Sequence, residues 1–312
     1  MDIEYFRAEP ECKEPKQGGI CGGKHTNPLN LDSVNIVERN YRRLIFEYFE
    51  VAPKSIKILN NGHTVVVRLE YAAKHPSIMG GPLDGIYIFE QLQFYWFKRD
   101  GVDDEDHKNK VLLPPELHMI FRNMKYQTLD EAAMQSKGLA ILAYAYEITE
   151  NDNLFYKEIT EQLSHITKPH TETKFYDEID LWCFINIGME YYTYIGSLTT
   201  PPCSEEVIWL DFEEPTRISV RQVERFHRLY SIDNTQLPTS FPRLQPLNNR
   251  TVLYVTLQDY SDEDDLEIPS AIPFVDNLIG GASMRKPIEI SFVVTMLLLS
   301  LLTTKVAAFL MA

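Results

Sequence analysis

The most constraining feature of this 312-residue chain is a short segment in which apolar and polar side chains alternate. Residues 91–97 read Gln-Leu-Gln-Phe-Tyr-Trp-Phe. Successive side chains of a β-strand point to opposite faces of a sheet, so this segment predicts a strand with one apolar and one polar face. The apolar face would hold Leu92, Phe94 and Trp96, and the polar face Gln91, Gln93 and Tyr95. Residues 116–120 predict a second strand, with Glu116, His118 and Ile120 on one face.

Strand-like runs also dominate the rest of the chain between residues 64 and 257. They are rich in β-branched and aromatic residues, and Gly, Pro and Asn separate them. These runs are residues 64–69, 86–97, 117–121, 139–146, 207–212 and 251–257. Because strands outnumber helices and no βαβ alternation is present, the sequence predicts a mostly β fold of the α+β class, not a doubly wound sheet.

Helical patterns are fewer. Apolar residues recur with helical spacing at Leu154, Phe155, Ile159, Leu163 and Ile166. Residues 219–222, Ser-Val-Arg-Gln, form a capping-box pattern at the start of a second helix. The apolar face of that helix would hold Val223, Phe226 and Leu229.

The chain is acidic, with 45 Asp and Glu residues against 30 Lys and Arg residues and a formal net charge of −15. Binding to nucleic acid requires a basic surface, so we expect no nucleic-acid partner. Hydrophobic residues make up 44% of the chain, which is enough for one large core. Acidic runs at residues 103–106 and 262–267 are expected to be solvated loops.

Several longer motifs resemble those of the α-carbonic anhydrases. The family motif Gln-x-His-x-His-Trp stands here as Gln-Leu-Gln-Phe-Tyr-Trp at residues 91–96, and its Glu-Leu-His stands unchanged at residues 116–118. Four further motifs follow the family's order, at residues 60–63, 138–141, 194–203 and 243–250. The resemblance covers residues 21–257 and implies one domain, with a large, mainly antiparallel central sheet and short peripheral helices.

In that family, three histidines bind a catalytic zinc ion. The resemblance implies that Gln93 and Tyr95 replace two of them and that only His118 keeps a metal-ligand position. A catalytic zinc needs three protein ligands and an open position for water, so we expect no zinc cofactor. The favoured interpretation is that Gln93, Tyr95 and His118 hydrogen-bond one another on a pocket floor. An altered metal site that uses Tyr95 is the alternative.

Other positions also receive family roles through the resemblance. His63 matches the proton shuttle, and Thr199 and Glu105 match the pair that orients the zinc-bound hydroxide; we expect none of the three to be catalytic here. Thr199 and Glu105 are instead expected to hold the loop before residues 201–202. Asp106 replaces a family histidine. The positions that match the substrate pocket are Gln91, Ile120, Ile141, Leu198, Thr200 and Trp209.

Secreted members of the family carry a disulfide at the positions of Cys21 and Cys203, and the resemblance implies the same bridge here. In the chain-entropy model, a bridge across so long a loop contributes about 4–5 kcal/mol. Two free thiols are the alternative. Asn249 begins the glycosylation sequon Asn-Arg-Thr, which agrees with a secreted route.

The C-terminal tail has the order of a glycosylphosphatidylinositol signal: small residues, a polar spacer and a terminal apolar segment. The small residues are Gly280, Gly281, Ala282 and Ser283, the spacer is residues 284–290, and the apolar run is residues 292–302. A retained membrane-spanning helix and a structural helix are the alternatives. The opening Met-Asp-Ile-Glu has no signal-peptide pattern, so we expect an incomplete gene start, with a cytosolic start as the alternative.

These observations predict four parts: an irregular segment at residues 1–18, an α-carbonic-anhydrase-like domain at 19–259, an acidic stalk at 260–283 and an anchor signal at 284–312. The leading hypothesis is a catalytically inactive protein of the cell surface, which binds an unidentified extracellular ligand and reaches the membrane through its anchor. The alternative is a zinc enzyme that hydrates CO₂ to bicarbonate with altered ligands. A decayed copy without a selected role is the third possibility.

Overall fold

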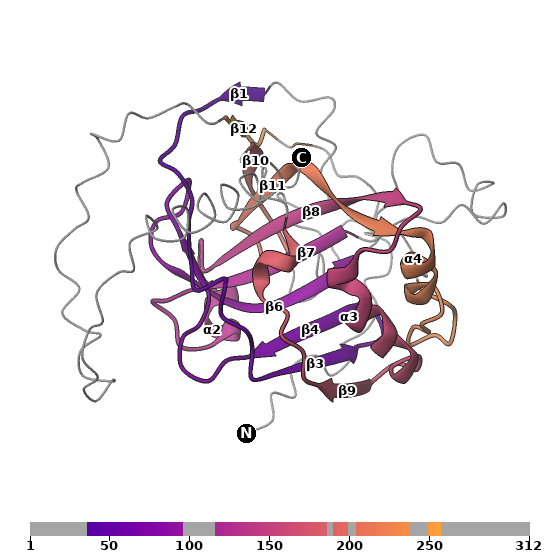
Figure 1. Ribbon diagram of the computed structural model, residues 1–312. Coiled ribbons are helices and arrows are strands. Elements are labelled where there is room, and N and C mark those ends of the chain that lie inside the picture. The colour runs from indigo at the N-terminus through magenta and orange to yellow at the C-terminus, as the bar shows by residue number, and fades with distance from the viewer. Residues whose placement is uncertain are drawn as a thin grey trace, which may run out of the picture. The chain divides into compact units, whose positions relative to one another are not determined.

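The computed structural model describes residues 36–95, 116–185, 190–198, 204–237, 247 and 249–256. A twelve-stranded sheet dominates these residues (Figure 1). Across it the strands follow the order β1, β12, β10, β11, β8, β7, β6, β4, β3 and β9, while β5 pairs with β6 and with β2. Most neighbours are antiparallel; β1 pairs with β12 and β8 with β11 in parallel. The mainly antiparallel sheet that the resemblance implies is confirmed.

The strands have the following bounds: β1 Ile36–Glu38, β2 Ile45–Glu47, β3 Ser55–Asn60, β4 Val65–Glu70, β5 Ser77–Met79, β6 Tyr87–Tyr95, β7 Glu116–Asn123, β8 Leu139–Thr149, β9 Thr171–Phe175, β10 Tyr191–Gly196, β11 Val207–Ser219 and β12 Val252–Val255. The α-helices are α2 Leu129–Ala133, α3 Lys157–Gln162 and α4 Val220–Phe226, and the 3₁₀ helices are η1 Leu154–Tyr156, η2 Leu163–His165 and η3 Leu181–Phe184. Within the described ranges, no helix has the length and apolar content needed to cross a membrane.

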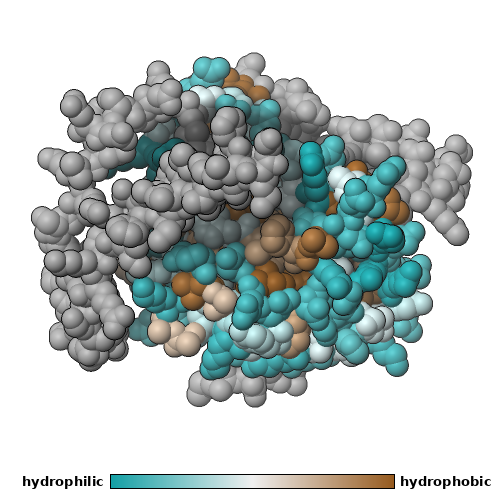
Figure 2. Space-filling view, viewed as in Figure 1, coloured by the Kyte–Doolittle hydropathy of each residue, from teal (hydrophilic) through white to brown (hydrophobic). Residues whose placement is uncertain are grey.

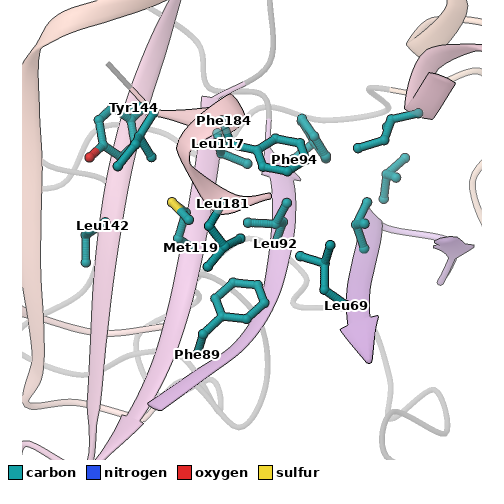
Figure 3. Close-up of a cluster of buried hydrophobic side chains, with 14 of the residues drawn as sticks. Leu69, Phe89, Leu92, Phe94, Leu117, Met119, Leu142, Tyr144, Leu181 and Phe184 are labelled. Atoms are coloured by element: carbon teal, nitrogen blue, oxygen red, sulfur yellow. The ribbon is translucent and has the colours of Figure 1, made fainter. Parts of the chain in front are cut away.

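Two hydrophobic cores lie on opposite faces of the sheet. In the first core, the alternate residues Leu92 and Phe94 of β6 pack with Met119 of β7 and with Leu181 and Phe184 of η3 (Figure 3). The second core lies on the opposite face and contains Ile120, Ile141, Tyr194, Val207 and Trp209. Fully burying one such large apolar side chain contributes roughly 1.5–3 kcal/mol. Because side chains alternate along each strand, Gln93 and His118 lie on the face of the second core.

The two helical predictions have different outcomes. In residues 154–166, Ile159, Leu163 and Ile166 are buried as predicted, but Leu154 is 78% exposed and Phe155 is 56% exposed. The prediction is wrong for these two because the segment begins with a 3₁₀ turn, which shifts the side-chain phase away from helical spacing. The capping box at the start of α4 is confirmed. The backbone N–H of Gln222 donates to Ser219 Oγ, and the backbone N–H of Ser219 donates to Gln222 Oε1.

Candidate functional site

Strand pairing brings together the three positions that match the family's zinc ligands. In the register of β6 and β7, Gln93 lies opposite His118, and Tyr95 lies opposite Glu116. All three side chains are buried: the exposed fraction is 6% for Gln93, 8% for Tyr95 and 1% for His118. Buried polar groups need hydrogen-bond partners, so the contacts of these three side chains decide what the site can hold.

The two replacement residues bind each other. The Tyr95 hydroxyl donates a hydrogen bond to Gln93 Oε1 at 2.5 Å. This contact was expected from the sequence, and it satisfies two buried polar groups at once. The amide oxygen of Gln93 is therefore already an acceptor from within the protein. The expected hydrogen bond from the pair to His118 stays a prediction.

His118 is held by a carboxylate and by aromatic rings. Its Nε2 lies 2.7 Å from Glu116 Oε1, so the imidazole donates to the carboxylate at this nitrogen. The Tyr95 ring packs against the imidazole at 4.7 Å between centroids, and Trp209 meets it edge-on at 5.0 Å. Tyr194 in turn lies parallel to Trp209. These contacts fix the orientation of the imidazole within a mostly aromatic wall.

The donor set does not fit the family's catalytic zinc. Zinc in such sites takes neutral imidazoles, thiolates or carboxylates, and leaves one position for water. Here one imidazole is accompanied by an amide oxygen that already accepts a hydrogen bond and by a phenol. A phenol binds zinc well only after losing its proton, and the reference pKa of tyrosine is about 10. Among the described residues, no group of three His, Cys, Asp or Glu side chains is arranged to hold a metal ion.

The structure gathers most of the expected pocket residues into the second core. Ile120, Ile141 and Trp209 are buried there, and the partly buried Leu198 packs against them. Gln91 is also buried, and its Oε1 accepts a hydrogen bond from Arg68 Nε at 3.1 Å. This amide thus has a structural partner on the neighbouring strand β4, which the sequence did not reveal.

The remaining candidate positions are dispersed or lie outside the described ranges. His63 is an exposed residue in the loop between β3 and β4. Although the side chain reaches solvent, the protein atoms around the imidazole displace water from it and lower its pKa; the Asp233 charge opposes this shift and His170 adds to it. Asn249 is exposed, as a glycosylation acceptor must be. The positions outside the described residues are Cys21, Glu105, Asp106, Thr199, Thr200, Cys203, Gly280, Gly281, Ala282 and Ser283.

Sequence reasoning missed a half-buried acid beside the site. Asp211 of β11 lies opposite Ala143, which lies opposite His118 in the next strand pair. Tyr194 Oη donates to Asp211 Oδ2 at 2.9 Å, and Oδ1 is buried with no hydrogen-bond partner among the described residues. Burial raises the pKa of the Asp211 carboxyl well above its ordinary value, and the negative charge of Glu116 raises it further. The sequence did contain a signal for this acid. Asp211 stands two positions after Trp209, so the two side chains lie on the same face of a strand.

Replacing Asp211 with asparagine should therefore stabilise the protein at neutral pH. A carboxyl whose pKa is raised by folding ionises more easily in the unfolded chain, so its contribution to stability falls as the pH rises from about 4 toward the folded-state value. Asparagine does not ionise, and it keeps an acceptor for Tyr194. In thermal unfolding, the Tm gain of Asp211→Asn should grow from about pH 4 to about pH 7. Glu150→Gln, at an exposed position, should show no such trend, and a pH-independent Tm difference for Asp211→Asn would contradict the argument.

Comparisons with known proteins identify the family of this chain. The family model for eukaryotic-type carbonic anhydrase matches residues 11–256. Carbonic anhydrase 7 of Mus musculus is 34% identical over 244 residues, covering 75% of this chain and 89% of that protein. Carbonic anhydrase 15 of Mus musculus is 30% identical over 264 residues, covering 80% and 81%. Carbonic anhydrase 5B, mitochondrial, of Rattus norvegicus is 31% identical over 249 residues, covering 77% of each. Matches of this extent show that the chain belongs to the eukaryotic-type carbonic anhydrases.

Proposed function

We propose that this chain is a carbonic-anhydrase-related protein that does not hydrate CO₂ and acts as a binding domain. One observation carries the proposal: Tyr95 and Gln93 bind each other at the positions that match two of the family's zinc histidines. A zinc ion at this place would have to break that hydrogen bond and would still find only His118 as an imidazole ligand.

The expected loss of zinc affinity is large. Changing a residue that merely orients a zinc ligand typically costs about 10–100-fold in metal affinity or activity. Here two of the ligands themselves are replaced. If each replacement costs at least about 10–100-fold, the combined loss of zinc affinity is at least about 10²–10⁴-fold. Breaking the buried contact between Tyr95 and Gln93 would add the desolvation penalty of two polar groups, about 1–3 kcal/mol each.

A zinc lyase with altered ligands is the second candidate, and one contact favours it. A zinc-bound histidine commonly donates its second ring nitrogen to a carboxylate, and Glu116 accepts from Nε2 of His118 in this way. Nδ1 would then be the nitrogen available to a metal. The relatives described above, all named carbonic anhydrases, also favour this candidate.

Restoring both histidines should separate the two candidates. The double variant Gln93→His plus Tyr95→His would place two imidazoles on the strand face that already carries His118. It should bind zinc and gain CO₂ hydration that a sulfonamide inhibits, whereas the parent should have neither property. Each single variant should recover far less, because two imidazoles do not complete a three-ligand site.

Two outcomes of that experiment would count against the proposal. Zinc-dependent CO₂ hydration by the parent protein would establish the lyase instead. A folded double variant without zinc affinity would show that the loss of the two histidines is not what prevents metal binding. Thermal unfolding of all four proteins provides the control for folding.

We also propose that the protein is held at the cell surface by a lipid anchor attached within residues 280–283. The support is the order of small residues, spacer and apolar segment in the C-terminal tail. When the chain is expressed with a working signal peptide, phosphatidylinositol-specific phospholipase should release it from intact cells. Retention under conditions that release a known anchored protein would favour a membrane-spanning helix.

A further inference from the structure

A partly open cavity lies on the other face of the sheet from His118. Its volume is about 320 Å³, and its wall is formed by Thr160 and Glu161 of α3, Leu163 and Ser164 of η2, Thr167, Arg225 of α4 and Arg228. Helices α3 and α4 pack on the first core through Ile159, Val223 and Phe226. Figure 2, viewed as in Figure 1, shows a mostly hydrophilic surface over this pair of helices. This volume is within the range of small-molecule sites, about 300–1,000 Å³.

Two guanidinium groups, those of Arg225 and Arg228, line this cavity. In the described ranges, several cations lie 2.5–3.5 Å from a carboxylate oxygen: Lys57, Arg122, Lys174, Arg217 and Arg221. Arg225 and Arg228 form no such ion pair with any described residue. They are three positions apart, and residues at that spacing in a helical segment lie on one side.

The surroundings position Arg225 without neutralising its charge. The side chain is partly buried, and Nη1 donates to Thr160 Oγ1 at 3.4 Å. That hydroxyl donates in turn to the backbone oxygen of Lys157. The Asp152 carboxylate also acts electrostatically on Arg225, but it is already held by Ser219 and Arg221. Most of the donor capacity of Arg225 is therefore still open to a ligand.

Glu161 lowers the positive charge of the cavity but does not remove it. It lines the same space, yet it lies in no ion pair with Arg225 or Arg228. Two guanidinium groups and one carboxylate leave a net positive charge. Thr167, partly buried, adds a hydroxyl to the wall.

We propose that this cavity binds a sulfate or phosphate group, either as the free anion or as a substituent of a sulfated sugar. Arginine forks bind tetrahedral oxyanions through paired, charge-assisted hydrogen bonds, and two forks in one cavity present several such donors. The volume exceeds what one small anion fills, since a water molecule occupies about 30 Å³ of the liquid. This space leaves room for the sugar ring that would carry a sulfate. The site is independent of His118, so its failure would leave the proposed function untouched.

Calorimetric titration of the full chain tests this site with four probes: inorganic sulfate, inorganic phosphate, a sulfated oligosaccharide and the same oligosaccharide after desulfation. Saturable binding of at least one oxyanion-bearing probe is expected, with none for the desulfated sugar. Tighter binding of the sulfated sugar than of either free anion identifies a glycan site. Equal or weaker binding identifies a site for the free anion. Absence of saturable binding for all probes overturns the proposal.

Substitutions of charged residues test where the anion binds. Arg225→Gln plus Arg228→Gln should weaken it at least about tenfold, because one charge-assisted hydrogen bond is worth roughly a factor of ten or more. Arg39→Gln plus Arg42→Gln removes the same charge from two exposed arginines that do not line the cavity, and it should change affinity by less than about twofold. Glu161→Gln should strengthen binding.

An equal loss in both double variants would indicate diffuse attraction to the surface and would overturn the site. The single variant Arg228→Gln alters an exposed residue, so it remains informative if the partly buried Arg225 proves necessary for folding. It should weaken binding while leaving the Tm unchanged, and unaltered affinity in this variant would contradict the assignment.

Discussion

The hydrogen bond between Tyr95 and Gln93 is the contact on which the interpretation of this molecule depends. Both side chains are buried on a sheet face where their polar groups must find partners within the protein. Each group satisfies the other, so the pair is stable without a metal ion. Either replacement alone would leave one buried polar group without this partner, which explains in physical terms why the two are compatible as a pair.

The polar pair and the large hydrophobic core lie on opposite faces of the sheet. Leu92 and Phe94 alternate with Gln91, Gln93 and Tyr95 along β6, and they belong to the large core on the opposite face. A change at Gln93 or Tyr95 therefore leaves that core intact. The fold of a zinc enzyme can persist after its metal ligands change, because the ligands contribute little to the packing of the main core.

The sequence predicted those features that depend on local alternation. Alternation placed Gln93 and Tyr95 on one strand face, the family resemblance added His118 from the neighbouring strand, and the sequence pattern predicted the capping box at Ser219. The sequence did not predict β9, Thr171–Phe175, because an edge strand needs no apolar alternation. Neither Arg68 as the partner of Gln91 nor Asp211 beside Tyr194 was foreseen, since such contacts depend on which strands become neighbours.

The most direct test of this account is the zinc content of the parent protein. It should be produced in zinc-supplemented medium, dialysed against a weak chelator and analysed by elemental mass spectrometry beside the Gln93→His plus Tyr95→His variant. The account predicts zinc at background level in the parent and stoichiometric zinc in the variant. A stoichiometric amount of tightly held zinc in the parent would contradict it, because the contact between Tyr95 and Gln93 could then not describe the occupied site.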